Sequence, residues 1–499
     1  MSTSGGLAVL GGRLRARLGD DAVVTDHARL RTYECDGLSQ YRVTPGIVVL
    51  AEAADDVVAT VEECVAAGVP YVARGSGTGL SGGALPRVDG VLIVVTKMRA
   101  LLELDVANER AVVEPGVINL DVTRAASGAG WYYAPDPSSQ QICSIGGNVA
   151  ENSGGAHCLK YGFTTNHVTG LEVVTQDGPV SLGGGKSVDP PGYDLLGAFV
   201  GSEGTLGVTT KVTVRLLRAP EAVQTFLAAF GTPDEAGAAT SAIIGAGIVP
   251  AAIEMMDALA IEAAEAAVGC GYPAGAGAVL VVELDGPAAE VAAGAALVEK
   301  HCVEHGSFEI RIAADDAERA LIWRGRKSAF AAVGRISPDY LVQDGVIPRT
   351  ALSEVLAEIA TLSAGTGVRV ANVFHAGDGN LHPLVLFDGA VTGQAEQAEE
   401  VSAAILDICI DHGGSITGEH GVGMDKAKHM PRMFTEDDLH TMQGLRCAFD
   451  PAGLSNPGKI FPTPRLCGEV PGYHRAGEDP IPEGRGLPEL QQAGAAEIF

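Results

Sequence analysis

The chain has 499 residues, 46% of them hydrophobic, and is therefore long enough for two domains with separate cores. Its 62 acidic and 34 basic residues give a formal net charge of −28, which disfavours binding to nucleic acid or to anionic lipid. An anionic substrate would need a local cationic or metal site. The longest apolar runs are short and the N-terminus has no basic start before a long apolar stretch, so we expect neither a transmembrane segment nor a signal peptide.

The nine cysteines are scattered along the chain and form no C-x-x-C pair. This pattern predicts a reducing compartment and, without a signal peptide, a cytoplasmic location. It also disfavours an iron–sulfur cluster or an attached haem within the chain, because both usually draw on closely spaced cysteines.

In chain order, the first half begins with a strand at 46–50, a helix at 53–67 and a strand at 71–73, which leads into a glycine-rich loop. More strands are expected at 91–95, 101–104, 111–114, 171–175 and 206–217. After about residue 218 the pattern changes to alanine-rich helices at 234–246, 256–268, 287–301 and 315–333, with a strand at 278–284. We therefore expect an N-terminal segment (1–41), a first domain (42–220), a second α+β domain (221–462) and a partly ordered tail (463–499).

The loop Arg74-Gly-Ser-Gly-Thr-Gly-Leu-Ser-Gly-Gly83 contains the pattern G-x-G-x-x-G, which also occurs in nicotinamide-binding Rossmann folds. In that fold the third glycine lies in a helix, but here the chain continues through Pro86 and Gly90, which do not propagate one. The small residues would instead let consecutive backbone N–H groups surround a pyrophosphate. The alternative is a flexible linker.

Two further loops combine glycine with hydroxyl and amide side chains: Pro135–Ser139 together with Ser144–Gly155, and Gly201–Val208. Each of them alone could be a turn. Three such loops in one domain indicate an extended polar ligand, longer than a mononucleotide.

The second domain contains His375-Ala-Gly-Asp-Gly-Asn-Leu-His382 and, later, Gly418-Glu419-His420. Two imidazoles and a carboxylate in glycine-rich loops could supply three ligands of a divalent metal. Hydrogen-bonded loop residues are the alternative, because the spacing alone does not distinguish the two.

Six motifs follow one another along the chain: RGSGTGLSGG, EPGV, PDPSS, SIGGN, KYG and GSEGTLG. In this order they resemble the FAD-binding domain of the vanillyl-alcohol oxidase type, and the resemblance extends from about residue 25 to 462. Within that superfamily, YECDGLSQYR, NVAENSGGAHCLKYG, GRISPDY and VANVFHAGDGNLHP are similar to the D-subunit family of bacterial glycolate oxidases. The resemblance implies an α+β protein, with a two-subdomain FAD-binding domain over 42–220 and an α+β, ferredoxin-like substrate or cap domain over 221–462.

The resemblance also implies FAD as cofactor, and we expect it to be noncovalent. The 74–83 loop has no histidine, and Cys143 and His157 are the nearest candidates for covalent attachment. The residues implied in FAD binding are Arg74, Gly75, Ser76, Gly77, Thr78, Gly79, Ser81, Pro135, Asp136, Ser138, Ser144, Gly147, Asn148, Gly154, Val208 and Asn456.

In the second domain, His375, His382 and Glu419 match positions that hold a divalent metal in related FAD-linked 2-hydroxy acid dehydrogenases, and we expect Zn, Mn or Fe. His420 matches an active-site position, and we expect it to accept the hydroxyl proton of the substrate. Arg326, in Trp-Arg-Gly-Arg, matches the arginine that binds the substrate carboxylate, although a helix arginine is usually a solvated surface group.

The expected reaction is oxidation of a small 2-hydroxy acid, glycolate to glyoxylate, with hydride transfer to flavin N5. Val342 stands where some relatives carry a lysine, which disfavours a dicarboxylic substrate. D-lactate is an alternative substrate, since one methyl group changes discrimination by only about 1–3 kcal/mol. A noncatalytic flavin-binding electron-transfer or assembly subunit is an alternative from another class.

The reduced flavin must pass its electrons on, so the chain needs a partner. The resemblance implies a second flavoprotein-like subunit and an iron–sulfur subunit, in a glycolate oxidase complex that is cytoplasmic or peripheral at the inner face of the cell membrane.

Overall fold

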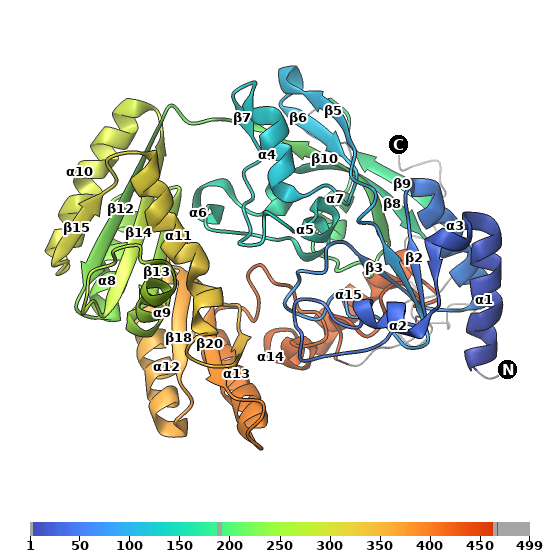
Figure 1. Cartoon of the computed structure of the whole chain (residues 1–499). Helices are drawn as coiled ribbons and strands as arrows, with labels where there is room; N and C mark the ends of the chain where they lie inside the picture. The colour runs from blue at the N-terminus through green and yellow to red at the C-terminus, as the bar shows by residue number, and fades with distance from the viewer. Residues whose placement is uncertain (1–2, 187–191, 463–466, 468–499) are drawn as a thin grey trace, which may run out of the picture.

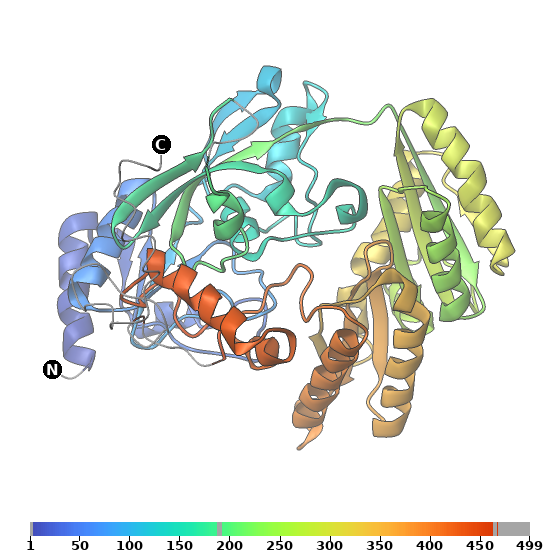
Figure 2. The same ribbon diagram turned by 180° about the vertical axis from the view of Figure 1, so that it is seen from behind.

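The computed structural model describes residues 3–186, 192–462 and 467. The chain forms two bodies side by side, an N-terminal one drawn from blue to green and a second one drawn from yellow to orange (Figure 1). The red C-terminal segment returns from the second body to the first, as the reverse view in Figure 2 also shows.

The first sheet has the strand order β1-β2-β4-β3, in which β2 and β3 both pair in parallel with β4. Helix α3 buries Val57, Val61 and Cys64 against this sheet and ends at Gly68 in the left-handed conformation. The predicted strand–helix–strand opening is therefore confirmed. The elements are α1 (Thr3–Leu18), β1 (Val23–Val24), α2 (His27–Leu30), β2 (Ile47–Leu50), α3 (Ala54–Ala67), β3 (Tyr71–Arg74) and β4 (Val91–Val94).

The second sheet is antiparallel, with the order β5-β6-β10-β8-β9, and its core packs against α4, α5 and α7. The strand predicted over 206–217 is present as β10, with a register shift between Thr209 and Lys211. The elements are β5 (Leu101–Asp105), β6 (Arg110–Val113), α4 (Asn119–Ser127), β7 (Trp131–Tyr132), α5 (Ile145–Glu151), α6 (Cys158–Tyr161), β8 (Val168–Thr175), β9 (Gly178–Gly183), α7 (Leu195–Phe199), β10 (Val208–Arg215) and β11 (Leu217–Arg218).

The second body is one large antiparallel sheet covered by helices on both faces. Alternation along β12 shows why: Phe226 and Phe230 belong to one core cluster with α8, α10, α12 and α13, while Leu227 and Ala229 belong to another with α9 and α11. The elements are β12 (Ala222–Phe230), α8 (Pro233–Gly245), β13 (Ala252–Asp257), α9 (Ala258–Val268), β14 (Ala278–Gly286), α10 (Ala288–Glu304), β15 (Glu309–Ile312), α11 (Asp316–Val333), β16 (Asp339–Val342), β17 (Gly345–Val346), α12 (Leu352–Thr366), β18 (Val370–His375), β19 (Asn380–Leu381), β20 (Pro383–Phe387) and α13 (Gln394–Asp411).

The returning segment contains α14 (Met430–Met433) and α15 (Glu436–Phe449). After α15 the chain pairs with β3, because Tyr71 N–H donates to Leu454 O and Asn456 N–H donates to Tyr71 O, at 2.9 and 2.8 Å. Residues that we grouped with the second domain by sequence therefore lie against the first body, next to the glycine-rich loop.

A disulfide joins Cys447 of α15 to Cys467, and the other seven cysteines are free thiols. We did not predict this pairing when we expected a reducing compartment, because the two cysteines are 20 positions apart and belong to no recognisable motif. The remainder of the predicted tail lies outside the described residues. None of the described helices is long and apolar enough to cross a membrane.

Candidate active site

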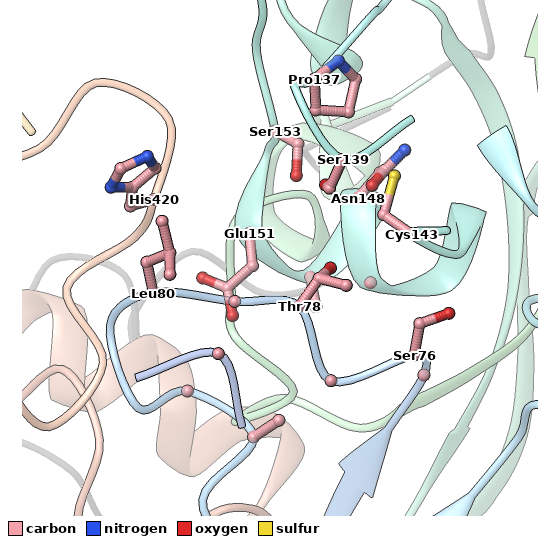
Figure 3. A pocket seen from close by; sticks show the side chains of 18 of the residues that line it. Ser76, Thr78, Leu80, Pro137, Ser139, Cys143, Asn148, Glu151, Ser153 and His420 are labelled. Carbon is pink, nitrogen blue, oxygen red and sulfur yellow. The ribbon is translucent and has the colours of Figure 1, made fainter. Parts of the chain in front are cut away.

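A cavity of about 760 Å³ lies between the two bodies. Its floor is the glycine-rich loop after β3, and one wall is α5 with the loop before it. The opposite wall is made by Phe330, Tyr340 and Val342 of the second body, and by His382 and His420. Figure 3 shows the loop of His420 facing Leu80, with Glu151 between Leu80 and Thr78.

Eleven residues that the sequence implied in FAD binding line this cavity. They come from the three glycine-rich stretches, the second of which forms helix α5, and the fold brings these stretches together. They are Arg74, Gly75, Ser76, Gly77, Thr78, Gly79, Ser138, Ser144, Gly147, Asn148 and Val208.

The other five do not line the cavity, and their contacts show why. Ser81 is fully buried, with its backbone carbonyl accepting from Met424 and Asp425 N–H. Asp136 is turned toward His157 Nδ1, at 2.8 Å, and Asn456 Nδ2 donates to the carbonyls of Gly83 and Glu203. Pro135 is buried with its carbonyl bound by Asn119, and Gly154 packs beside Glu419 and Phe163.

The glycine-rich loop is held in a shape that suits an anion. Gly77 has φ of +71°, and a side chain there would clash with the guanidinium of Arg74. That guanidinium donates to Cys35 O at 2.6 Å, and Ser76 N–H donates to Ser144 Oγ at 3.3 Å. Backbone atoms of the glycine-rich loop, together with hydroxyl groups from this loop and from Ser144, therefore face the cavity. Such an arrangement suits a pyrophosphate.

His375, His382 and Glu419, the three metal ligands expected from the sequence, meet at one carboxylate oxygen. Glu419 Oε1 lies 3.0 Å from His382 Nε2 and 3.3 Å from His375 Nε2. Ligand atoms of Asp344, His382, Glu419 and His420 also lie within 4.8 Å of one another. Glu419 Oε2 and His420 Nδ1 are buried without a hydrogen-bond partner. Unpartnered buried atoms in an N and O donor set fit a divalent metal such as Zn, Mn or Fe, with positions left for substrate.

Asp344 holds the loop that carries Glu419 and His420. Its carboxylate accepts from the N–H groups of Gly418 and His420, at 2.9 and 2.8 Å, and lies 3.3 Å from Lys426 Nζ. Burial opposes ionisation, but His420 in its protonated form and Lys426 outweigh it and lower the pKa of Asp344. A buried carboxylate thus fixes the direction in which both side chains point.

His420 lies in the cavity wall with a neutral ring. Burial lowers its pKa to about 4, although Asp344 acts in the opposite direction. Neutral imidazole with one unpartnered nitrogen is the form that accepts a proton.

Arg326, which we expected to bind the substrate carboxylate, does not line the cavity in this structure. It is 2% exposed and lies in α11, with Nη2 2.6 Å from Glu254 Oε2. The other oxygen of Glu254 is 2.8 Å from His375 Nδ1. Arg326 Nε has no hydrogen-bond partner, and its guanidinium lies over the ring of Phe330, which does line the cavity. One carboxylate thus connects the expected substrate arginine to an expected metal ligand.

Of the two candidates for covalent flavin attachment, only Cys143 lines the cavity. His157 is engaged at both ring nitrogens, with Asp136 at 2.8 Å and Glu283 at 3.3 Å. Burial would lower its pKa, but these two carboxylates raise the pKa to about 10. His157 therefore links the two bodies.

Glu151, Glu203, Asp344 and Glu254 also shape the site, and sequence reasoning gave none of them a role. Glu151 and Glu203 stand within the quoted glycine-rich stretches, where they were not distinguished from their small neighbours. Asp344 could have been found from its place two residues after Val342, the position at which some relatives carry a lysine. Glu254 lies in an ordinary apolar strand, and only the burial of its carboxylate, which the structure shows, distinguishes it from other acidic residues.

Comparison with known proteins agrees with this geometry. Residues 45–182 match an FAD binding domain, and residues 219–460 match the C-terminal domain of FAD linked oxidases. The chain is 50% identical to glycolate oxidase subunit GlcD of Escherichia coli (strain K12), over 90% of this chain and 91% of the relative. It is 39% identical to subunit GlcD of Bacillus subtilis (strain 168), over 86% and 92%, and 30% identical to D-lactate dehydrogenase of Anaerostipes hadrus, over 84% and 90%.

Solved structures share the fold at low identity. The 4-ethylphenol oxidase from Gulosibacter chungangensis superposes with a TM-score of 0.75 at 17% identity, covering 92% of this chain and 97% of that one. A p-cresol methylhydroxylase gives 0.75 at 16% identity, covering 91% and 97%.

Together, the fold, the cavity and the two matched domains define an FAD-linked oxidoreductase. Within that class, the chain belongs to the family of the glycolate oxidase subunit GlcD.

Proposed function

We propose that the chain oxidises glycolate to glyoxylate with FAD, as the catalytic flavin subunit of a glycolate oxidase complex. The observation that carries the proposal is the cavity in which the glycine-rich loops of the first body face His382, Glu419 and His420 of the second. A cofactor site and a set of groups suited to a hydroxy acid thus share one space. The 50% identity to a glycolate oxidase subunit over 90% of the chain supports glycolate as the substrate.

The three glycine-rich loops would hold FAD. Gly75 to Gly79 would bind the pyrophosphate with backbone N–H groups, and Ser138, Ser144 and Asn148 would line the flavin and its chain. We propose that FAD is noncovalent, since His157 is bound to carboxylates on both sides and burial raises the pKa of the Cys143 thiol, which disfavours the reactive thiolate. Bound FAD supplies the hydride acceptor that amino-acid side chains lack.

The groups of the opposite wall would prepare the substrate. A divalent metal held by His375, His382 and Glu419 would supply a Lewis acid beside the substrate hydroxyl. His420, neutral and with a free ring nitrogen, would accept the hydroxyl proton as the hydride leaves the adjacent carbon.

Arg326 would bind the substrate carboxylate in a two-point ion pair. Its guanidinium is buried against Glu254, so substrate binding requires it to turn past Phe330 toward the cavity. Val342 and Phe330 leave an apolar wall beside it, which suits a small monocarboxylate better than a dicarboxylate.

The reduced flavin would pass electrons to other subunits. The seven free cysteines are dispersed over the described chain and offer no cluster for single-electron transfer. We propose a second flavoprotein-like subunit and an iron–sulfur subunit as partners, in the cytoplasm or at the inner face of the cell membrane.

A second candidate function is oxidation of D-lactate, which the 30% identity to a D-lactate dehydrogenase favours. The two are separated by adding glycolate, D-lactate, L-lactate and D-2-hydroxyglutarate to the purified yellow protein without oxygen. Glycolate should bleach the flavin band fastest. Faster bleaching by D-lactate would identify D-lactate, rather than glycolate, as the substrate. If none of the four acids bleaches the flavin band, a noncatalytic subunit would be favoured.

A further inference from the structure

Glu151 is the last residue of α5, the helix that forms one wall of the cavity, and it lies between the two halves of the site. Its carboxyl group fills the space that two glycines leave open. A side chain at Gly83 would clash with Oε1, and one at Gly421 would clash with Oε2. Gly83 belongs to the proposed pyrophosphate loop and Gly421 follows His420. The carboxyl group therefore lies against both the glycine-rich loop and the loop that carries His420, and Figure 3 shows it between Leu80 and Thr78. A flavin ring placed between these two loops would lie beside it.

The Oε2 atom of Glu151 is buried and has no hydrogen-bond partner. In the described part of the chain, no Lys, Arg or His side chain lies within ion-pair distance of this carboxyl group. A buried polar group without a hydrogen-bond partner is destabilising, so a partner from outside the chain is expected. The cavity that Glu151 lines is the place for that partner.

Glu203 is the acid next to Glu151, and its hydrogen bonds differ from those of Glu151. Both of its oxygens accept backbone N–H groups, from Val422 and Gly423, each at 2.7 Å. Burial raises the pKa of Glu203 to about 7, although these two N–H groups lower it, and Glu151 has no such donors. Burial raises the pKa of Glu151 well above its ordinary value, and Glu203 and Asp36 add to the effect, while Lys426 and Lys459 oppose it.

We infer that the carboxyl group of Glu151, in the cavity wall, donates a hydrogen bond to an acceptor atom of the flavin ring. The inference rests on the proposed function, because it requires FAD in this cavity. A neutral donor is the form that suits a flavin, since the ring gains negative charge when it accepts electrons and an ionised carboxylate beside it would oppose reduction. Glu151 is thus a cofactor-contacting residue that tunes the flavin.

The test compares Glu151→Gln and Glu151→Ala in the full chain. Glutamine keeps the size and a donor but cannot ionise, whereas alanine removes the donor. The readouts are the dissociation constant for FAD, measured by titrating the apoprotein, the shape of the visible flavin band, and the reduction potential of the bound flavin. Glu52→Ala serves as the control for loss of an acid, because Glu52 is an exposed partner of Lys97 far from the cavity lining.

Glu151→Ala should weaken FAD binding at least fivefold, shift the flavin band and lower the reduction potential. Glu151→Gln should stay within about twofold of the original affinity and keep the band, which also shows that the site still folds. An alanine variant with unchanged affinity, band and potential would overturn the inference, as would a glutamine variant that behaves like alanine. If the unmodified chain binds no FAD, the proposed function itself fails, and that result is distinct from either variant's.

Discussion

The rings of His382 and His420 stack almost in parallel, with centroids 4.9 Å apart and planes inclined by 10°. His382 follows β19 in the large sheet, whereas His420 lies on the loop that leads back to the first body. Asp344 holds that loop through backbone N–H groups. The stack therefore joins an expected metal ligand to the expected proton acceptor at the boundary between the two bodies.

Replacing His420 by Ala should remove the proton acceptor. We expect reduction of bound FAD by glycolate to slow by about 10²- to 10⁴-fold, which is the usual contribution of a general base. FAD should remain bound, because the glycine-rich loops are unchanged. Stopped-flow absorbance of the flavin band without oxygen measures the rate, and His412→Ala, a surface histidine paired with Glu358, is the control. A His420→Ala variant that is reduced at the original rate would remove His420 from this role.

Replacing Arg326 by Lys keeps the positive charge but loses the two-point geometry of the guanidinium. We expect KM for glycolate to rise by about 10- to 100-fold, the cost of a hydrogen bond to a charged group, with FAD affinity unchanged. Steady-state kinetics with an artificial electron acceptor measure it. Arg324→Lys is the matched control, because Arg324 lies in the same helix and faces solvent. An equal change in both variants would argue against a substrate contact by Arg326.

Replacing Gly77 by Ala should weaken FAD binding. The residue has φ of +71°, where a Cβ costs about 1–2 kcal/mol and here also meets the guanidinium of Arg74. A loss of about tenfold in FAD affinity is expected from titration of the apoprotein. Gly128→Ala is the control, since Gly128 has φ of −61° and open space around it. Equal FAD affinity of the Gly77→Ala variant would place the pyrophosphate elsewhere.

Glu254 should affect metal affinity through His375. A carboxylate that binds the second nitrogen of a ligating histidine orients the ring, and its loss usually lowers metal affinity by about 10- to 100-fold. Glu254→Gln should therefore lose metal during dialysis against a weak chelator sooner than the original protein, as measured by elemental analysis. Glu283→Gln is the control, since Glu283 lies in the neighbouring strand of the same sheet and contacts no expected ligand. Equal metal retention in the two variants would contradict this contact.

His157 should make stability depend on pH. Its pKa is about 10 in the folded protein, against an ordinary value of 6.5. Both folded and unfolded chains carry the proton below pH 6.5, so the ion pairs with Asp136 and Glu283 contribute fully there; the contribution falls as the pH rises from 6.5 to 10. Over that range His157→Gln should lose less free energy of unfolding than the original protein, by a few kcal/mol at most. Parallel pH profiles in urea denaturation would disprove the linkage.

The local motifs of the site could be predicted from the sequence, because the first glycine-rich loop follows an apolar strand, β3, and the third directly precedes the alternating strand β10. The helices at 258–268 and 316–333 were also found, since alanine-rich periodic stretches have a strong helical signal. In the helix that we expected from 256, however, Met256 belongs to β13. A buried strand that runs directly into a helix offers no turn residue to mark the boundary.

Contacts between distant segments could not be predicted. The return of residues 454–456 to β3, the Arg326–Glu254 pair and the Cys447–Cys467 disulfide each join residues that share no sequence pattern. For the same reason Asp136 and Asn456 were expected at the cofactor, whereas the structure turns them toward His157 and toward the carbonyls of Gly83 and Glu203.

The most direct test of hydride transfer from glycolate to bound FAD is the rate of flavin bleaching without oxygen, with ordinary glycolate and with glycolate deuterated at carbon 2. Glycolate should bleach the flavin band, and deuteration should slow bleaching severalfold, because the carbon–hydrogen bond breaks as the flavin is reduced. A flavin band that glycolate leaves unchanged would contradict hydride transfer from glycolate.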